Sequence, residues 1–230
     1  MAAKIITVCN QKGGTGKTTL SMNLAGALSL REHQVCVIDA DPQGTATRWA
    51  ASASDERPFP ASVLGLSAAR GKVHREVRKL VENYDYIIID CPPAADSPVP
   101  QSALLIADLG LIPIIPSPPD LWATLGIKTI VENAGDINEE LKARLVVNQL
   151  QSNVGISRDA LEILPEFGFE VCQTMLHHRA AYKQAALDGQ SVHKGGSRAK
   201  AAIEEVEALT DEILEILHPR KARQSSHSRR

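Results

Sequence analysis

A glycine-rich segment near the N-terminus carries the residues with the clearest chemistry in this chain. It extends from Gln11 to Thr19 and reads Gln-Lys-Gly-Gly-Thr-Gly-Lys-Thr-Thr, directly after an apolar run and directly before a segment of helical periodicity. Successive glycines allow backbone N–H groups to wrap a phosphate, and a helix N-terminus adds the positive end of its dipole. Lys17 can bridge the outer phosphates, and the Thr18 hydroxyl can ligate Mg²⁺. A chance glycine-rich turn is the alternative, but apolar run, loop, Gly-Lys-Thr and helix together favour a phosphate-binding loop.

Acidic side chains follow two apolar runs further along the chain. Asp39 and Asp41 come directly after Val35 to Ile38, and Asp90 ends the run that begins at Tyr86. Proteins built on parallel sheets bind their ligands at the carboxyl ends of the strands, so these acids are candidate site residues. A carboxylate at the end of a fully apolar strand also needs a partner, and we expect Asp90 to hold Mg²⁺ through water. An Asp-Pro turn in which Asp41 only caps backbone is the alternative.

A basic segment lies in the last quarter of the chain. Between His177 and Lys200 it holds five Lys or Arg against Asp188 alone. Contact with the nucleic-acid backbone needs clustered cations and little else, so the segment is a candidate DNA surface. An ordinary solvated face is the alternative, and we interpret the neighbouring histidines as surface or packing residues rather than metal ligands. The candidate DNA-binding residues are Arg179, Lys183, Lys194, Arg198 and Lys200.

Apolar runs alternate along the chain with segments of helical periodicity, and the strands and helices that they predict must position the candidate residues. Runs that are too apolar to alternate faces predict a mostly parallel, twisted α/β sheet with helices on both faces. The predicted strands are Ile5 to Val8, Val35 to Ile38, Tyr86 to Ile89, Leu109 to Ile115 and Leu145 to Val147. The predicted helices are Lys17 to Arg31, Thr45 to Ala53, Lys72 to Asn83, Val99 to Ala107, Leu121 to Gly135 and Ser197 to Leu217.

The last predicted helix is amphipathic and is followed by a basic tail. Apolar residues from Ile203 to Leu217 keep helical spacing, so one face should pack on the body. The acidic residues should face water, and these are Glu204, Glu205, Glu207, Asp211 and Glu215. From His218 onward there are five Lys or Arg and no acid. We therefore expect one folded domain over residues 1–217 and a disordered basic tail over 218–230.

Composition narrows the possible classes of protein. The formal charge of −2 hides an asymmetry, because without the tail the chain carries 20 basic against 27 acidic residues, so any affinity for DNA must be local. The four cysteines are far apart and include no Cys-x-x-Cys pair, which favours buried free thiols over zinc or iron–sulfur ligation. No apolar run is long enough to span a membrane, and the N-terminus does not resemble a signal peptide. We expect a cytoplasmic protein.

The phosphate-binding loop also points to a family. The common pattern G-x-x-x-x-G-K-[ST] would place glycine at Gln11 and does not expect Lys12, whereas the segment resembles the deviant Walker A loop K-G-G-x-x-K-[ST] of ParA and MinD proteins. The resemblance continues through Asp39 to Gln43, Ile87 to Pro93 and Pro113 to Asp120. It therefore covers nearly the whole folded chain and implies a P-loop NTPase fold.

The resemblance assigns roles to individual residues. Lys12 would be the signature lysine that reaches the partner's phosphates in an ATP-bound dimer, where a second cation stabilises developing charge. Asp41 would orient the attacking water, and Asp39 would support the Mg²⁺ and its waters. Asn148 would read the adenine edge, although an ordinary strand-end turn is the alternative. The implied sets are Lys12, Lys17 and Asp41 for catalysis; Lys12, Gly13, Gly14, Thr15, Gly16, Lys17, Thr18, Thr19 and Asn148 for the nucleotide; and Thr18, Asp39 and Asp90 for the metal.

The chain departs from the family pattern beside the base, where many relatives have a proline and this sequence has His177. The resemblance implies a slow ATPase with ATP and Mg²⁺ as cofactors, a homodimer in the ATP state, and nucleoid association through non-specific double-stranded DNA. A ParB-type centromere-binding partner would stimulate hydrolysis in plasmid or chromosome segregation. A MinD-like ATPase at a membrane surface is the alternative, but that branch needs a basic amphipathic C-terminal helix, so we expect no membrane partner.

Overall fold

The centre of the molecule is a parallel β-sheet. The computed structural model describes residues 2–93, 96–151 and 164–219, with backbone only for residues 118–124 and 165–166. Its 7-stranded sheet has the order β3-β2-β4-β1-β5-β6-β7, and every pairing between neighbouring strands is parallel. The strands are β1 (Lys4–Val8), β2 (Val35–Asp39), β3 (Ser62–Gly65), β4 (Tyr86–Asp90), β5 (Leu109–Ile114), β6 (Lys142–Val147) and β7 (Glu170–Val171). The predicted α/β sheet is confirmed.

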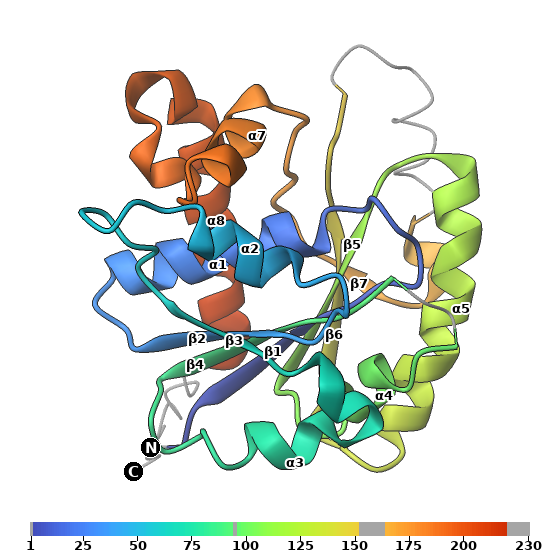
Figure 1. Ribbon diagram of the computed structural model, residues 1–230. Helices are drawn as coiled ribbons and strands as arrows, with labels where there is room; N and C mark the ends of the chain where they lie inside the picture. The colour runs from blue at the N-terminus through green and yellow to red at the C-terminus, as the bar shows by residue number, and fades with distance from the viewer. Residues whose placement is uncertain (1, 94–95, 152–163, 220–230) are drawn as a thin grey trace, which may run out of the picture.

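Helices cover both faces of this sheet (Figure 1). One layer contains α1 (Lys17–Leu30), α2 (Thr45–Ala51), α7 (Ala180–Leu187) and α8 (Lys200–Leu217). The other contains α3 (Val73–Val77), α4 (Val99–Leu104) and α5 (Pro118–Gly135). Short 3₁₀ turns complete the described chain, namely η1 (Ser67–Lys72), η2 (Leu164–Phe167), η3 (Val192–Lys194) and η4 (Gly196–Ala199). Each strand that carries a candidate acid is therefore enclosed between two helical layers.

Two separate hydrophobic cores explain why the central strands are apolar throughout. Ile6 and Val8 of β1 pack with α1 and α8 on one face, whereas Ile5 belongs to the core under α3, α4 and α5. The same alternation holds in β4, where Ile88 faces the first core and Ile87 the second. Because successive strand residues point to opposite faces, a strand that is covered on both sides must be apolar at every position. The four cysteines are buried free thiols, as predicted.

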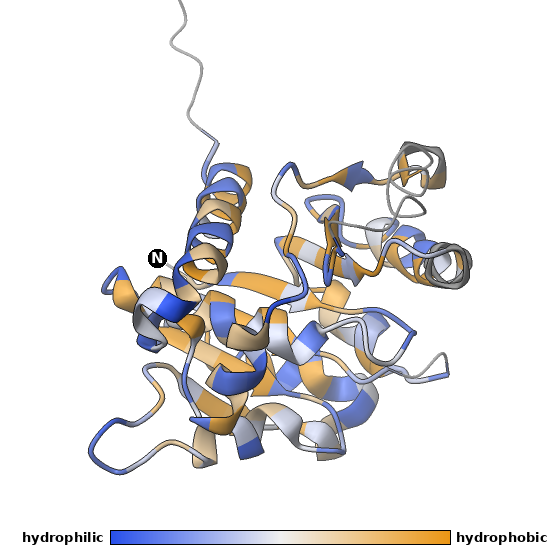
Figure 2. Ribbon diagram, turned by 90° about the horizontal axis from the view of Figure 1, so that it is seen from above, coloured by the Kyte–Doolittle hydropathy of each residue, from blue (hydrophilic) through white to orange (hydrophobic). Residues whose placement is uncertain are grey.

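The C-terminal helix α8 is amphipathic, and it carries hydrophobic and hydrophilic residues in turn along its length (Figure 2). Val206, Leu209 and Ile213 are buried in the first core, as predicted. The prediction that its acidic face is turned to water is wrong for two residues. The Glu205 side chain is 14% exposed and bonded to Arg179, and Glu207 pairs with Arg31. The difference arises from tertiary contacts, which cannot be predicted from the periodicity of one helix.

Several elements differ from the sequence-based prediction. The edge strand β3 was not predicted because three of its four residues are exposed, which leaves no apolar pattern. The two-residue strand β7 and the alanine-rich helix α7 were also missed. The helix predicted from Lys72 to Asn83 ends at Val77, and the turns that follow still pack Leu80 against the core. The predicted tail begins at His218, whose Nε2 lies 2.9 Å from the Tyr86 hydroxyl, and residues 220–230 lie outside the described part.

Candidate functional site

The loop between β1 and α1 has the backbone shape that its glycines predict. Gly14 and Gly16 have φ values of 79° and 87°, in the left-handed region that glycine adopts without strain. A Cβ atom on Gly16 would fall 2.2 Å from Nδ2 of Asn148, so a second constraint also requires glycine there. The loop runs into α1 at Lys17, which directs the N-terminal backbone N–H groups of α1 toward the loop. This arrangement has the backbone shape that a phosphate cradle requires, and phosphate binding by the loop stays a prediction.

Lys17 lies inside the curve of this loop. Its side chain is almost fully buried, and Nζ donates a hydrogen bond of 2.9 Å to the carbonyl oxygen of Lys12. Burial lowers the pKa of Lys17, and the negative charge of Asp90 acts in the opposite direction. The backbone N–H of Lys12 donates to Oδ1 of Asn10, whose Nδ2 in turn donates to the carbonyl oxygen of Pro113. Asn10 therefore fixes the start of the loop, a role that we did not predict.

Asp90 lies beside the first turn of α1. Its Oδ2 accepts a hydrogen bond of 2.7 Å from the Thr18 hydroxyl, and its Oδ1 accepts one of 3.3 Å from Ser21. Burial raises the pKa of Asp90 to about 7, against the hydrogen bond from Thr18, which lowers it. A hydroxyl and a carboxylate in contact at the end of a phosphate-binding loop are the oxygen ligands that Mg²⁺ takes beside nucleotide phosphates. Thr18 and Asp90 thus fit the predicted metal role.

The other two acids mainly hold the segment that leads into α2. Asp39 is 1% exposed, and its Oδ2 accepts hydrogen bonds from the backbone N–H and the hydroxyl of Thr47. Oδ1 of Asp41 accepts a bond of 2.9 Å from the backbone N–H of Gln43, so the predicted alternative of a backbone-capping turn is present. Within the described residues, no group of three His, Cys, Asp or Glu side chains could hold a metal. The predicted role of Asp39 at the Mg²⁺ and that of Asp41 in catalysis both stay predictions.

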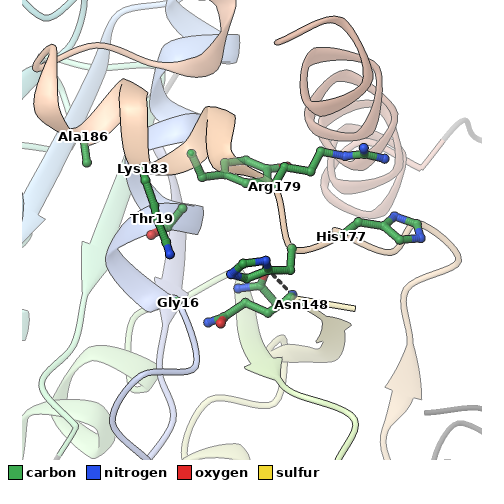
Figure 3. Close-up of a pocket in the computed structure, with 10 residues that line it drawn as sticks. Gly16, Thr19, Asn148, His177, Arg179, Lys183 and Ala186 are labelled. Carbon is green, nitrogen blue, oxygen red and sulfur yellow. Dashed lines mark hydrogen bonds between the residues drawn. The ribbon is translucent and has the colours of Figure 1, made fainter. Parts of the chain in front are cut away.

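A cavity of about 200 Å³ opens beside the loop, between the start of α1, the end of β6 and helix α7 (Figure 3). Its volume is below the range of about 300–1,000 Å³ typical of whole-ligand pockets, so it suits one part of a nucleotide such as the base. Asn148 lines it, with Nδ2 donating to the Thr15 carbonyl oxygen and Oδ1 accepting from Gln149 N–H. The cavity is lined by Gly16, Thr19, Asn148, Gln149, His177, His178, Arg179, Tyr182, Lys183 and Ala186.

The candidate DNA-binding residues do not form one surface. Arg179 and Lys183 line the cavity beside the loop, where Lys183 is directed toward Thr19 and Arg179 toward α8 (Figure 3). Lys194 and Arg198 are exposed and line a different cavity of about 440 Å³ between α7 and the 3₁₀ turns η3 and η4. Lys200 is exposed at the start of α8, and its Nζ lies 3.8 Å from Oε1 of Glu204. The cations of the predicted set are therefore divided between two places.

Some residues that shape the site gave no recognisable signal in the sequence. Ser21 and Thr47 contact the two buried acids from α1 and α2, and Gln149 donates from Nε2 to the Gly14 carbonyl oxygen. Gln149 also has a φ of 54°, uncommon for a residue with a side chain. Its position directly after Asn148 at a strand end is the one feature that could have suggested it. The other two contacts depend on how helices cross the sheet.

Comparisons with known proteins agree with this geometry. Residues 6–192 match the model of the CobQ/CobB/MinD/ParA nucleotide binding domain. The chain is 34% identical to the maintenance of carboxysome distribution protein A of Halothiobacillus neapolitanus, over 91% of this chain and 95% of that one. It is 26% identical to the sporulation initiation inhibitor protein Soj of Bacillus subtilis, over 86% and 94%. The ATP complex of a Cyanothece McdA variant has the same fold, with a TM-score of 0.76, 20% identity and coverage of 94% and 96%.

Proposed function

The chain belongs to the family of CobQ/CobB/MinD/ParA nucleotide-binding domains and is an ATPase of the ParA/MinD type, and we propose that it is a ParA-type positioning switch. In this proposal MgATP closes a homodimer, the dimer binds double-stranded DNA on the nucleoid without sequence preference, and a partner protein stimulates hydrolysis. The observation that carries the proposal is the loop itself, which joins Lys12 and the buried Lys17 to the Thr18–Asp90 pair.

The site residues divide the nucleotide chemistry among them. Backbone N–H groups of the loop and Lys17 would hold the β- and γ-phosphates, and Thr18 and Asp90 would hold the Mg²⁺, which supplies charge neutralisation. Asp41 would orient the attacking water, with its carboxylate close enough to Lys17 to influence the pKa of that lysine. Lys12 would act across the dimer on the partner's phosphates. The described loops show no arginine in these roles, which fits slow turnover before stimulation.

Lys194, Arg198 and Lys200 are the proposed DNA contacts. All three are exposed and lie on adjacent 3₁₀ turns and the first residue of α8. One protomer offers few phosphate contacts, so its binding is weak and quickly reversed, whereas an ATP-linked dimer doubles those contacts on one rigid surface. Binding to DNA should therefore require ATP. With roughly six phosphates neutralised per dimer, log affinity should fall with log salt at a slope of about −5.

The test separates this surface from the basic tail. Arg198→Glu with Lys200→Glu should abolish ATP-dependent DNA binding, measured by fluorescence anisotropy with a labelled duplex. A chain that ends at Pro219 should retain it and keeps the contact between His218 and Tyr86. Lys72→Glu with Lys79→Glu is the matched control, because it makes the same charge change at exposed positions beside α3. If the truncation removes all DNA binding and the Arg198 and Lys200 reversals change nothing, the tail is the DNA contact.

The cargo of the switch has two candidates. The proposed cargo is plasmid or chromosomal DNA, carried through a ParB-type centromere-binding protein. A protein compartment is the second candidate, because the relative with 34% identity over nearly the full length of both chains maintains the distribution of carboxysomes. A MinD-like membrane role has less support, since α8 presents Glu204, Asp211 and Glu215 rather than a basic face. Among the described helices, none has the length and apolar character to cross a membrane.

Partner-stimulated hydrolysis distinguishes these candidates. The rate of phosphate release would be measured for the protein alone, with DNA, and with each protein encoded beside it in the genome. Stimulation by a protein that binds a specific DNA site supports DNA segregation, and stimulation by one that binds a protein shell supports compartment positioning. Stimulation by anionic lipid vesicles in place of DNA would favour the membrane role. Hydrolysis at tens per second by the protein alone would contradict the switch model.

A further inference from the structure

One carboxylate from α8 contacts three residues in the α7-side wall of the cavity, which is also joined to the end of β6 by backbone hydrogen bonds of Leu150 with Leu176 and His178. Glu205 Oε1 lies 2.7 Å from Nδ1 of His177, and Oε2 accepts from the backbone N–H of the same residue at 3.2 Å. Arg179 approaches with Nε 3.1 Å from both carboxylate oxygens and an Nη 2.6 Å from Oε1. The Tyr182 hydroxyl lies 3.5 Å from Oε2. One side chain thus gathers three residues that line the cavity.

The Glu205 carboxylate stays ionised near neutral pH. Burial acts to raise the pKa of Glu205, but hydrogen bonds from Arg179 and His177 more than offset it and leave the pKa below its ordinary value of 4.5. The Glu205 side chain is 14% exposed and that of Arg179 is 35% exposed. A charged, partly buried pair with a planar fork of donors fixes geometry better than a solvated ion pair. The ion pair between Glu205 and Arg179 therefore favours one fixed geometry for this wall of the cavity.

The contacts of Glu205 all come from the segment that faces the start of α1 across the cavity. His177 and Arg179 precede α7 and are directed toward α8, whereas Lys183 in α7 is directed toward Thr19 (Figure 3). The opposite wall is already fixed, because Asn148 and Gln149 are bonded to the phosphate-binding loop. Replacing Glu205 should therefore disturb the α7 side of the cavity and leave the Asn148 side in place.

We propose that Glu205 is a positioning residue for the base of the bound nucleotide. It holds the segment from His177 to Tyr182 at the distance from Thr19 and Asn148 that accepts a purine, while taking no part in phosphate binding. The proposal rests on the ATP-binding function above. It also assigns Arg179 to this network rather than to DNA, because its guanidinium is already engaged by the carboxylate.

A second glutamate on the same helix provides a matched control. Glu212 lies seven residues further along α8 and accepts hydrogen bonds from the backbone N–H groups of Gln173 and Thr174 at 2.7 and 3.0 Å. It anchors the stretch of chain just before His177 to the same helix, but neither Gln173 nor Thr174 lines the cavity. Replacing Glu212 therefore reproduces the loss of an anchoring carboxylate without disturbing the base wall.

The experiment compares a ligand that has a base with one that has none. Calorimetric titration would measure the Kd of MgATP and of magnesium tripolyphosphate for the wild type, Glu205→Gln and Glu212→Gln. Loss of a charged hydrogen-bond network in the wall should weaken ATP binding of Glu205→Gln by about tenfold or more. The Kd of tripolyphosphate should not change. Glu212→Gln should leave both values as in the wild type, even if its thermal stability falls.

Each outcome is decisive. ATP binding by Glu205→Gln equal to that of the wild type, or an equal loss for ATP and tripolyphosphate, would overturn the positioning role. A wild type that binds tripolyphosphate but gains nothing from the adenosine would instead count against the proposed ATPase site. If Glu205→Gln does not fold, Arg179→Lys keeps the charge and loses the planar fork, so it should weaken ATP binding selectively in the same direction. An unchanged Kd in that variant would equally contradict the proposal.

Discussion

At the scale of single residues, the site depends on a few buried polar groups that hold one another in place. Lys17 bonds to the carbonyl oxygen of Lys12, and Thr18 bonds to Asp90. Lys17 and Asp90 are both buried, and burial lowers the pKa of the lysine and raises that of the acid, while the electrostatic interaction between the two opposes both shifts. A triphosphate with Mg²⁺ matches both side chains, since the lysine faces the anionic oxygens and the carboxylate faces the metal.

The first prediction concerns Lys17. Lys17→Ala should reduce MgATP affinity by about 100-fold or more, because a hydrogen-bonded charge opposite the outer phosphates is lost. Calorimetric titration with a non-hydrolysable ATP analogue measures the effect. Lys4→Ala removes a lysine from the other end of β1, where it pairs with Asp108, and should leave affinity unchanged. Unaltered binding by Lys17→Ala would show that the nucleotide lies elsewhere.

At the scale of elements, the turn before η3 connects the proposed DNA surface to the nucleotide loop. The indole N–H of Trp49 in α2 donates to the carbonyl oxygen of Gln190 at 3.0 Å. The backbone N–H of Val192 donates to Oδ1 of Asn23 in α1 at 2.9 Å. The segment 189–192 is buried between these two helices, directly before Lys194. These two hydrogen bonds join both helices to the turn that leads into the exposed cations.

The second prediction tests how tightly the turn before η3 packs against its neighbours. Gly189 and Gly196 have φ values of 63° and 60°, but a Cβ on Gly189 would lie 2.1 Å from the backbone nitrogen of Ala53, whereas one on Gly196 meets nothing within 4 Å. Gly196→Ala should cost only the backbone strain, about 1 kcal/mol. Gly189→Ala should cost about 3 kcal/mol or more, since backbone must move. Urea unfolding with equal m-values measures both, and equal costs would mean that the turn is loosely packed.

At the scale of the whole molecule, the sheet brings the candidate residues for nucleotide and metal binding to the carboxyl ends of its strands. The phosphate-binding loop, Asp39, Asp90 and Asn148 each follow a parallel strand, so they share the carboxyl end of the sheet. Two hydrophobic cores hold that edge rigid from both sides. Gly13 and Gly14 are exposed on this edge, which leaves the loop open to a second molecule. The homodimer proposed above would use this exposed side of the loop.

The third prediction concerns assembly. Lys12→Ala should retain MgATP affinity within about threefold, because its proposed charge acts on the partner's phosphates, yet it should lose ATP-dependent dimerisation and hydrolysis. Light scattering with an ATP analogue measures the dimer. Lys79→Ala removes an exposed lysine beside α3 and should dimerise normally. A normal ATP-bound dimer of Lys12→Ala would reduce this residue to an ordinary loop lysine.

The sequence by itself determined the features that local patterns encode. The conformation of the loop from Gln11 to Thr19 could be predicted because its glycines and the start of the following helix are adjacent in the sequence. The uniformly apolar strands predicted a sheet that is covered on both faces. Ser62–Gly65 escaped prediction because an exposed edge strand carries no such pattern. The loop also indicated the family, because Lys12 and Lys17 lie within it at the spacing of the deviant Walker A pattern.

Only the tertiary structure decided which distant side chains meet. Glu205 was predicted to face water because periodicity reports the position of a residue on its own helix and nothing of the segment packed beside it. Arg179 is 26 residues from Glu205 in sequence, and their contact turned a candidate DNA cation into part of the cavity wall. Lys183 and Lys194 are both exposed lysines, but only Lys183 lies beside Thr19 at the cavity. Residue type and spacing in the sequence indicate which side chains could bind or react. The packing of α7 and α8 against α1 determines which of them lie together at one site.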